Sequence, residues 1–308
     1  MSAGSGGSGA ANQPTASKTD QVRQIVDRAV ADLAEQLDHG DRSQLDAFLA
    51  ALSRFHRYSI NNVFLILSQR PEATRVAGFH TWRSLGRAVK RGEKGIAIFA
   101  PMLLRPKQTP QLENAEQDRD TPQLRFRVVH VFDISQTEGE PLPSLDRIGG
   151  DPGEALIALE SAVTASGIVL ETVDSLGGAE GISSGGRIRL REGLSPAERF
   201  SVLAHEWAHE KLHQTHAPSE RPDKVVRETE AEAVAFVVSQ AIGLETGSAS
   251  ADYIRLYRGD KETLAASLDR IQKTACSIIQ AIQDPDSAKS PSLPQATHSQ
   301  ANPRERSR

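Results

Sequence analysis

Cysteine is nearly absent from this 308-residue chain, because Cys276 is its only one. A single thiol excludes an intrachain disulfide and is typical of a reducing compartment, so we expect a cytoplasmic protein. The chain also lacks any apolar run of about 18 residues, which argues against a membrane-spanning helix. Residues 2–17 are rich in Gly, Ser and Ala and lack the apolar centre of a signal peptide.

Aromatic residues are scarce, at 5% of the chain, and there is no overall excess of positive charge, since the formal net charge is −4. The charge is nevertheless uneven. Between Arg54 and Lys107 there are 11 Lys and Arg against 2 Asp and Glu, a local net charge of +9 that leaves −13 for the rest. Such asymmetry predicts a polyanion-binding region joined to a neutral or acidic one.

Hydrophobic periodicity predicts an α+β protein. In the first half we expect helices over 21–37, 43–56 and 63–67, a strand over 74–77, a helix over 80–85, and paired strands over 96–104 and 124–132. In the second half we expect helices over 154–165, 224–241 and 264–282, and a helix that begins at Pro196 and includes 200–210. We also expect strands over 168–173 and 188–190 and a loop over 177–186, and in the first half a loop or hairpin excursion over 106–122.

Composition also predicts a division into domains. Residues 138–152 are rich in Gly and Pro and are expected to link a domain over 19–137 to a second over 153–284. The segments 1–18 and 285–308 have the composition of disordered tails.

The most informative motif is His205-Glu206-Trp207-Ala208-His209. Residues four apart share a helix face, so His205 and His209 can offer two imidazole nitrogens to one metal ion, with Glu206 beside it as a general base. A capping box at Ser195 and Glu198, with proline at the first helical position, predicts the helix that this geometry needs.

Two histidines leave a catalytic zinc site one protein ligand short. His213 lies about 6 Å further along the helix axis than His209, so it cannot converge on the same ion. A second helix packed against the first offers better geometry, and we expect Glu228 as the third ligand with Glu232 holding a ligand histidine. The downstream candidates are His213, His216, Glu228, Glu230 and Glu232.

A site with two histidines and one glutamate suits the hydrolysis of an amide bond by a zinc-activated water. The expected ion is Zn²⁺, with Mn²⁺ as the alternative. The strand at 188–190 is expected to offer an edge to an extended peptide substrate. An oxyanion is often stabilised by Tyr or His, and the candidates are Tyr253, Tyr257 and His216.

Two sets of motifs resemble a known family. The first set is YSINNV (58–63), RPEATRVAGF (70–79), TW (81–82) and GEKG (92–95), which resembles the N-terminal domain of ArdC-like antirestriction proteins. The second set is HEWAH (205–209) and ETEAEA (228–233), which resembles the ImmA/IrrE-type zinc metallopeptidase domain. The resemblance covers roughly residues 20–283.

This resemblance implies an N-terminal α/β domain that binds single-stranded DNA and a mainly helical, zincin-like metallopeptidase domain with a small sheet. It also implies a plasmid- or phage-associated protein, and it supports Glu228 as the third ligand. The chain departs from the family pattern at 181–186, where tyrosines are expected and the sequence is GISSGG.

The basic first half has the residue types of a single-strand binder, namely cations for phosphates and aromatic rings for stacking. Asn61 and Asn62 either contact bases or cap a helix. The expected DNA-binding residues are Arg75, Phe79, His80, Trp82, Arg83, Arg87, Lys90, Arg91 and Lys94.

The motifs and the resemblance are compatible with three functions. The first is a zinc metallopeptidase that acts beside single-stranded DNA, with a protein or peptide as substrate and no membrane partner. The second is an antirestriction protein that binds DNA and has a structural metal site. The third is a regulatory peptidase that cleaves a repressor. The presence of Glu206 favours an enzyme, because a structural metal site does not need a general base.

Overall fold

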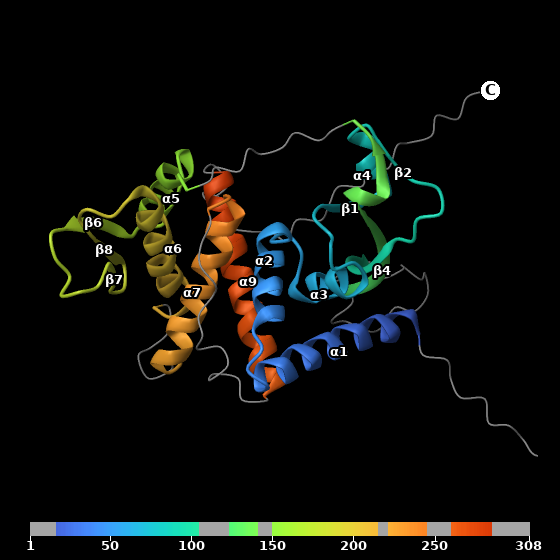
Figure 1. Cartoon of the computed structure of the whole chain (residues 1–308), viewed down its shortest axis with the longest axis horizontal. Helices are drawn as coiled ribbons and strands as arrows, with labels where there is room; N and C mark the ends of the chain where they lie inside the picture. Colours follow the sequence, from blue (N-terminus) through green and yellow to red (C-terminus); the bar gives the residue numbers. More distant parts are fainter. Residues whose placement is uncertain (1–16, 105–122, 141–149, 215–220, 245–259, 285–308) are drawn as a thin grey trace, which may run out of the picture.

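The computed structural model describes residues 17–104, 123–140, 150–214, 221–244 and 260–284. The protein is α+β. Figure 1 shows the strands of residues 76–139 at one end of the molecule, the strands of residues 169–191 at the other end, and a group of helices between them. The order of elements follows the sequence expectation closely, with an N-terminal half that contains α1 to β5 and a C-terminal half that contains α5 to α9.

The N-terminal half begins with three helices. These are α1 (Lys18–Asp38), α2 (Ser43–Arg54) and α3 (Ile60–Gln69). Apolar residues recur at helical spacing on each of them, so each helix buries one stripe. Phe48 of α2 stacks on Phe64 of α3, with ring centroids 4.2 Å apart. The three predicted helices are confirmed, although α1 begins at Lys18, inside the predicted tail.

The N-terminal sheet has the strand order β1-β4-β3 and is antiparallel throughout. Its strands are β1 (Val76–Gly78), β4 (Gln123–Asp133) and β3 (Ile96–Leu104). The register places Ile98 opposite Val129, and the predicted pairing of these two strands is confirmed. The short helix α4 (Phe79–Ser84) follows β1 directly.

Two amide side chains of α3 satisfy the backbone of the edge strand β3. Asn62 accepts a hydrogen bond from the N–H of Phe99 and donates to its carbonyl, both at 2.9 Å. Gln69 makes the same pair of bonds with Ala97, also at 2.9 Å. These amides replace a neighbouring strand and protect the edge from pairing with another chain. Asn62 therefore does not cap the helix, because Ser59 is the N-cap residue.

A short two-stranded sheet, β2 (Arg87–Val89) with β5 (Thr137–Gly139), lies beside α4 and was not predicted. Three-residue strands are too short to show a periodic pattern. Gly139 has φ of 136°, and a Cβ there would lie 2.4 Å from the carbonyl oxygen of Gly86, so only glycine fits. The strand β5 contains residues 138 and 139, which belong to the segment predicted to be a linker.

Asp133 at the end of β4 connects the strand to the loop before β1. Its Oδ1 accepts the N–H groups of Thr74 and Arg75 at 2.8 and 3.0 Å, and its Oδ2 accepts that of Ser135 at 2.9 Å. Asp133 is only 1% exposed. Burial acts to raise the pKa of this carboxyl, but the hydrogen bonds from Ser135, Thr74 and Arg75 outweigh it and lower the pKa.

The C-terminal half begins with α5 (Glu154–Ala165) and a three-stranded sheet of order β6-β8-β7. Its strands are β6 (Val169–Val173), β7 (Gly181–Ser183) and β8 (Arg187–Arg191). The central strand β8 runs parallel to β6 and antiparallel to β7. The strand β7 lies in the glycine-rich segment that was predicted to be a loop, since glycine has a low strand propensity.

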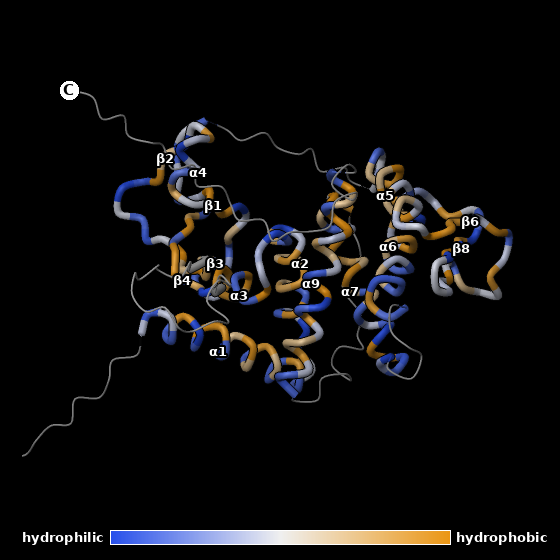
Figure 2. The backbone as a smooth tube through the Cα atoms, turned by 180° about the vertical axis from the view of Figure 1, so that it is seen from behind, coloured by the Kyte–Doolittle hydropathy of each residue, from blue (hydrophilic) through white to orange (hydrophobic). Residues whose placement is uncertain are grey.

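Three long helices complete the C-terminal half. They are α6 (Pro196–Leu212), α7 (Lys224–Ala241) and α9 (Lys261–Gln283), and all three were predicted. Figure 2 shows hydrophobic residues where α2, α7 and α9 lie together. The buried hydrophobic residues form one cluster that includes both halves. Gln272 of α9 also donates to the carbonyl oxygens of His56 and Tyr58 at 2.9 and 2.8 Å.

The division into domains at 138–152 stays a prediction, and residues 141–149 lie outside the described part. The segments 1–16, 106–122 and 285–308 also lie outside it. Within the described residues, no helix has both the length and the hydropathy that a membrane span requires.

Replacement of Asp133 by Asn is expected to lower the free energy of unfolding by about 2–4 kcal/mol at neutral pH, because buried N–H groups lose a charged acceptor. The folded-state pKa of Asp133 lies below its unfolded value. Its contribution is therefore present above about pH 4 and is lost as the pH falls through the folded-state pKa.

Urea denaturation at pH 7 and at decreasing pH measures this difference, with the exposed Asp27→Asn on α1 as the control. The account of Asp133 is wrong if Asp133→Asn and Asp27→Asn unfold at the same urea concentration at pH 7.

Candidate functional site

Helix α6 places the two motif histidines on one face, as the spacing predicted. The Ser195 side chain accepts the N–H of Glu198, and the Glu198 side chain accepts the Ser195 N–H at 2.8 Å, so the predicted capping box is present. One helical turn then separates His205 from His209, and their Nε2 atoms lie 3.0 Å apart. Two imidazole nitrogens approach this closely only if a proton or a cation lies between them.

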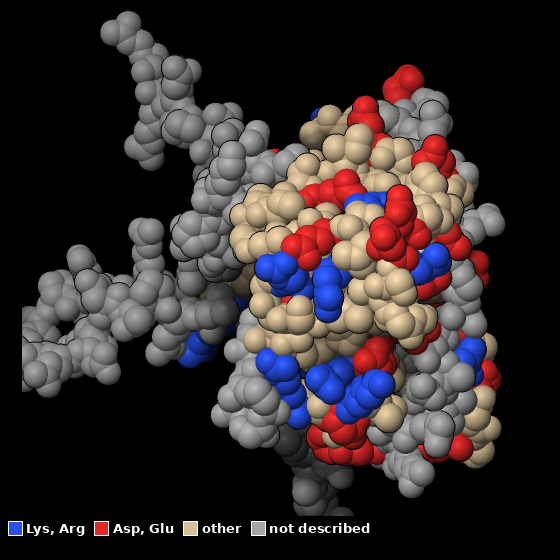
Figure 3. Space-filling view, turned by 90° about the vertical axis from the view of Figure 1, so that its left-hand side faces the viewer, with Lys and Arg blue, Asp and Glu red and all other residues tan. Residues whose placement is uncertain are grey.

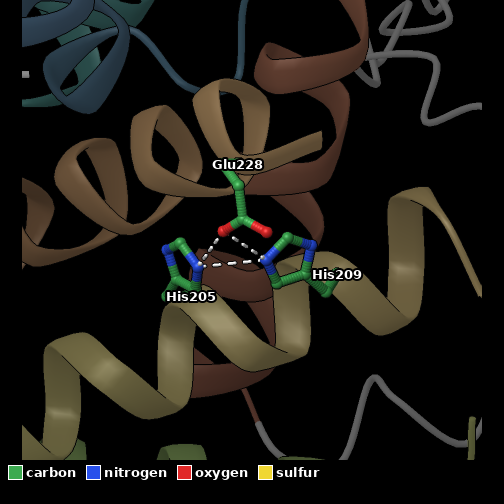
Figure 4. A group of neighbouring side chains, drawn as sticks. All are labelled: His205, His209 and Glu228. Atoms are coloured by element: carbon green, nitrogen blue, oxygen red, sulfur yellow. Dashed lines mark hydrogen bonds and ion pairs between the residues drawn. The ribbon is translucent and has the colours of Figure 1, made fainter. Parts of the chain in front are cut away.

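Glu228 reaches this pair from the second turn of α7. Its Oε2 lies 3.5 Å from Nε2 of His205 and 3.4 Å from Nε2 of His209. Figure 4 shows the carboxylate pointing from α7 toward the two rings on α6. The packing of α6 against α7 therefore brings together the three residues that were predicted as metal ligands.

These distances fit a single tetrahedral ion. Ligand bonds of about 2.0–2.1 Å at tetrahedral angles place the ligand atoms about 3.3 Å apart. The observed separations of 3.0, 3.4 and 3.5 Å lie close to this value. Two imidazoles and one carboxylate are donors that suit Zn²⁺, and they also suit Mn²⁺. The residues therefore form a possible metal site.

The surroundings favour the protonation states that bind a cation. The hydrogen bond to His205 and the charges of both histidines lower the pKa of Glu228 to about 2, against the opposing effect of burial. Burial lowers the pKa of His209 to about 4, and the neighbouring His205 acts in the same direction. At neutral pH the carboxylate is thus ionised and the His209 ring is neutral, so both have lone pairs to offer.

The Glu206 side chain lies against β7. A Cβ added at Gly181 would lie 2.8 Å from Cγ of Glu206 and 2.6 Å from Cγ1 of Val202, so the strand can approach the helix only with glycine there. Burial raises the pKa of Glu206, while the nearby His205 and a hydrogen bond from the Ser183 backbone oppose the rise. A carboxyl with a raised pKa is better suited to accept a proton near neutral pH.

Glu210 was not predicted, although it directly follows the motif. Its Oε1 accepts the N–H of Gly185 at 2.9 Å and its Oε2 accepts that of Gly186 at 2.8 Å. Both glycines have positive φ, so the turn between β7 and β8 presents two successive N–H groups to one carboxylate. This contact joins the turn to α6 one residue after His209. Two sequence features could have indicated this contact, namely the Gly185-Gly186 pair and the carboxylate of Glu210 directly after His209.

Glu230, two residues after Glu228, lies in a buried polar network. It accepts hydrogen bonds from Ser267 at 2.6 Å and from Arg270, both on α9. His213, the C-cap residue of α6, lies 3.9 Å from it and is buried. Neither Glu230 nor His213 belongs to the group of converging ligands. The helical spacing predicted that His213 would not converge on the same ion as His205 and His209.

The role predicted for Glu232 stays a prediction, because no hydrogen bond or ion pair among the described residues joins it to either ligand histidine. His216, Tyr253 and Tyr257 lie outside the described residues. The prediction of a substrate edge at 188–190 is wrong, because β8 is the central strand and pairs on both sides. In the part of the chain that the structure describes, β7 lies next to α6 and pairs with another strand on one side only.

The residues predicted to bind DNA lie on and around α4 and β2. The exposed ones are Arg75, Phe79, His80, Arg83, Lys90, Arg91 and Lys94. Trp82 is only 2% exposed and donates its indole N–H to the carbonyl of Phe132, so the stacking role predicted for it is wrong. Arg87 is partly buried and donates to Thr137 Oγ1 and to the Gly139 carbonyl, which holds β5 in place.

We expect the chain to bind one divalent ion. His205→Ala and Glu228→Ala should each weaken that binding more than about 100-fold, because each removes a ligand. Metal analysis after dialysis measures the bound ion, and the exposed Glu262→Ala on α9 is the control. An unchanged metal content in His205→Ala would exclude this site.

Glu210→Ala is expected to release the turn between β7 and β8. The two glycine N–H groups lose a charged acceptor, which should speed hydrogen exchange at 185 and 186 and cost about 1.5–3 kcal/mol. The control is Glu192→Ala, an exposed residue just after β8. If the exchange rates of these amides do not change, Glu210 does not hold the turn.

Comparison with known proteins supports a relationship for the N-terminal half. Residues 19–132 match the family model described as the N-terminal domain of anti-restriction factor ArdC. The uncharacterized protein pXO2-81 of Bacillus anthracis is 26% identical over 85% of this chain, which spans about half (51%) of that relative.

Two crystal structures of the antirestriction ArdC protein from plasmid R388 were also matched. The metal-free structure gives a TM-score of 0.48 at 17% identity, over 86% of this chain and 98% of that one. The Mn(II)-bound structure gives 0.46 at 18% identity, over 86% and 99%. Residues 19–132 therefore resemble the N-terminal domain of the anti-restriction factor ArdC.

Proposed function

We propose that the chain is a metal-dependent peptidase that binds single-stranded DNA. The observation that carries the catalytic part is the convergence of His205, His209 and Glu228 from two packed helices, with Glu206 on the same helix. A divalent ion bound there supplies Lewis acidity toward a carbonyl oxygen and toward water. Zn²⁺ is the proposed ion and Mn²⁺ is the alternative.

Glu206 has the role of general base in this proposal. It accepts a proton from the attacking water and passes it to the leaving amine. The contact with Gly181 and the Ser183 backbone holds its carboxylate beside β7. His205, His209 and Glu228 are the residues that would hold the ion.

The free edge of β7 is the proposed place for the peptide substrate. An extended peptide can add to a strand edge through backbone hydrogen bonds. The opposite edge of β7 is already paired with β8, and Glu210 fixes the turn that joins them. A substrate aligned on β7 therefore lies next to Glu206.

A purely structural metal site is the alternative, and two features count against it. Structural zinc sites usually have four protein ligands, whereas the described residues offer three to this ion. The Glu228 side chain is also about half exposed, so the site is open to solvent. Two functions compete with the proposed one. The first is an antirestriction protein without peptidase turnover, and the second is a peptidase that cleaves a repressor.

The DNA-binding part of the proposal rests on the match over residues 19–132 and on the local charge of +9 between Arg54 and Lys107. Seven of the nine predicted DNA-binding residues are exposed. Cations on an exposed surface neutralise phosphates and release counterions.

Glu206→Gln tests the catalytic proposal. We expect the variant to keep its metal but to lose about 100- to 10,000-fold in kcat, because a general base is removed while the ligands remain. Release of fluorescent peptides from labelled casein measures turnover, and metal analysis is the control. Equal turnover in both proteins contradicts the role of Glu206.

The same variant separates the competing functions in a cell. If Glu206→Gln protects incoming DNA from restriction as well as the wild type does, the antirestriction function does not need proteolysis.

Binding of a labelled single-stranded oligonucleotide tests the DNA proposal. The affinity should fall steeply with salt, and a plot of the logarithm of the binding constant against the logarithm of the salt concentration should have a slope of about −0.7 per phosphate neutralised. The affinity for the single strand should also exceed that for a duplex of the same length. Fluorescence anisotropy between low and physiological salt measures it. A flat salt response, or tighter binding of duplex, contradicts the proposal.

A further inference from the structure

The outer face of the β4–β3 pair carries aromatic and imidazole side chains that the sequence prediction did not include. Successive residues of a strand point to opposite faces, so Phe126, Val128, His130 and Phe132 share one face of β4. The register places Phe99 of β3 opposite Val128 on this face. The other face carries Ile96, Ile98 and Val131, which are buried in the core.

Phe126 and Phe79 are the exposed aromatic residues of this region. The Phe126 side chain is 54% exposed and that of Phe79 is 48% exposed, values that are unusual for large hydrophobic residues. Phe79 also packs edge-on against His80, with ring centroids 5.8 Å apart. His130, four residues after Phe126 on β4, is also exposed.

The sheet register connects these side chains into one track. Gly78, the last residue of β1, is opposite Val131, so Phe79 begins α4 level with His130. Phe126 and His130 are four residues apart on the same face, a separation of about 13–14 Å. The track thus runs from α4 across β4 toward the end of the β3–β4 hairpin.

The charge of this region favours a polyanion. Within β1, α4 and the described part of β3 and β4, the acidic residue is Asp133, which is buried and holds three backbone N–H groups. Arg83, Arg125 and Arg127 are exposed in the same elements. The opposite end of the molecule differs, since Figure 3 shows basic and acidic side chains side by side there.

At that opposite end, the basic side chains form ion pairs with acidic ones. These ion pairs join Arg187 to Glu171, and Arg191 to Glu180 at 3.5 Å. The sheet of the C-terminal half therefore offers a polyanion little net charge. The β4 region instead has rings on its outer face and exposed cations close by, with Arg83 on α4 and with Arg125 and Arg127 on the opposite face of β4.

We propose that single-stranded nucleic acid lies along the outer face of β4, with bases stacked on Phe126 and Phe79 and with His130 on the same face of the strand. This inference rests on the proposed DNA binding and places it on the sheet in addition to α4. Exposed aromatic rings on a sheet suit unstacked bases, because every base has a face to stack while duplex bases are occupied with each other. Arg83, four residues after Phe79 on α4, neutralises phosphates, and Arg125 and Arg127 on the opposite face of β4 add to the local positive charge.

The test compares Phe126→Ala with Phe126→Tyr in the full chain. Fluorescence anisotropy with labelled oligothymidylate should show about 5- to 100-fold weaker binding for Phe126→Ala, whereas Phe126→Tyr should bind like the wild type, because it keeps a ring. Ile157→Ala, which truncates a 65% exposed residue on α5, is the matched control and should bind normally. The melting temperature of each variant shows that the fold is kept.

Three outcomes overturn the inference, and they differ in what else they exclude. If the wild type binds oligothymidylate and Phe126→Ala binds equally well, the outer face of β4 is not the binding surface, and the DNA proposal survives. If the wild type does not bind single strands, the DNA proposal itself fails. If Phe126→Ala instead loses self-association at unchanged oligonucleotide affinity, the face is a contact between copies.

Discussion

The packing of α7 against α6 is the constraint on which the candidate site depends. Neither helix alone holds an ion, because His205 and His209 supply two donors and Glu228 comes from another part of the chain. The two helices bring the carboxylate oxygen within 3.4–3.5 Å of both imidazole nitrogens. The apolar faces of α6 and α7 are buried in the common core, and this packing fixes the distances between the three ligand atoms.

Helix α7 also joins the site to the N-terminal half. It packs against α2 on one side and α6 on the other. Gln272 adds a second connection by donating to the carbonyl oxygens of His56 and Tyr58 in the loop after α2. The helix that carries Glu228 is thus in contact with the half that matches the ArdC domain. The region proposed to bind DNA and the proposed catalytic centre belong to one packed body.

Much of this structure follows from the sequence. Long periodic segments predict the helices well, since burial of an apolar stripe dominates their stability. Helical spacing also predicts His205, His209 and, through the second helix, Glu228. The capping box at Ser195 identifies the start of α6 because its two reciprocal hydrogen bonds depend on local sequence only.

Other features depend on contacts that periodicity does not encode. The strand β7 exists because it pairs with β8 and because Gly181 fits against Glu206. Asn62 satisfies an edge strand 37 residues away, and Trp82 bonds to a carbonyl 50 residues away. The aromatic track could not be predicted without the strand register either, because Phe126 and Phe79 lie far apart in the sequence.

His205, His209 and Glu228 are proposed to bind one catalytic metal ion. The most direct measurement is a crystal structure of the protein grown with Zn²⁺ or Mn²⁺, with anomalous diffraction to locate the ion. The account predicts a single strong peak bonded at about 2.0–2.2 Å to both imidazole nitrogens and to the Glu228 carboxylate, with a coordination position open to solvent. An ion bound elsewhere, or coordination by the histidines without Glu228, would contradict it.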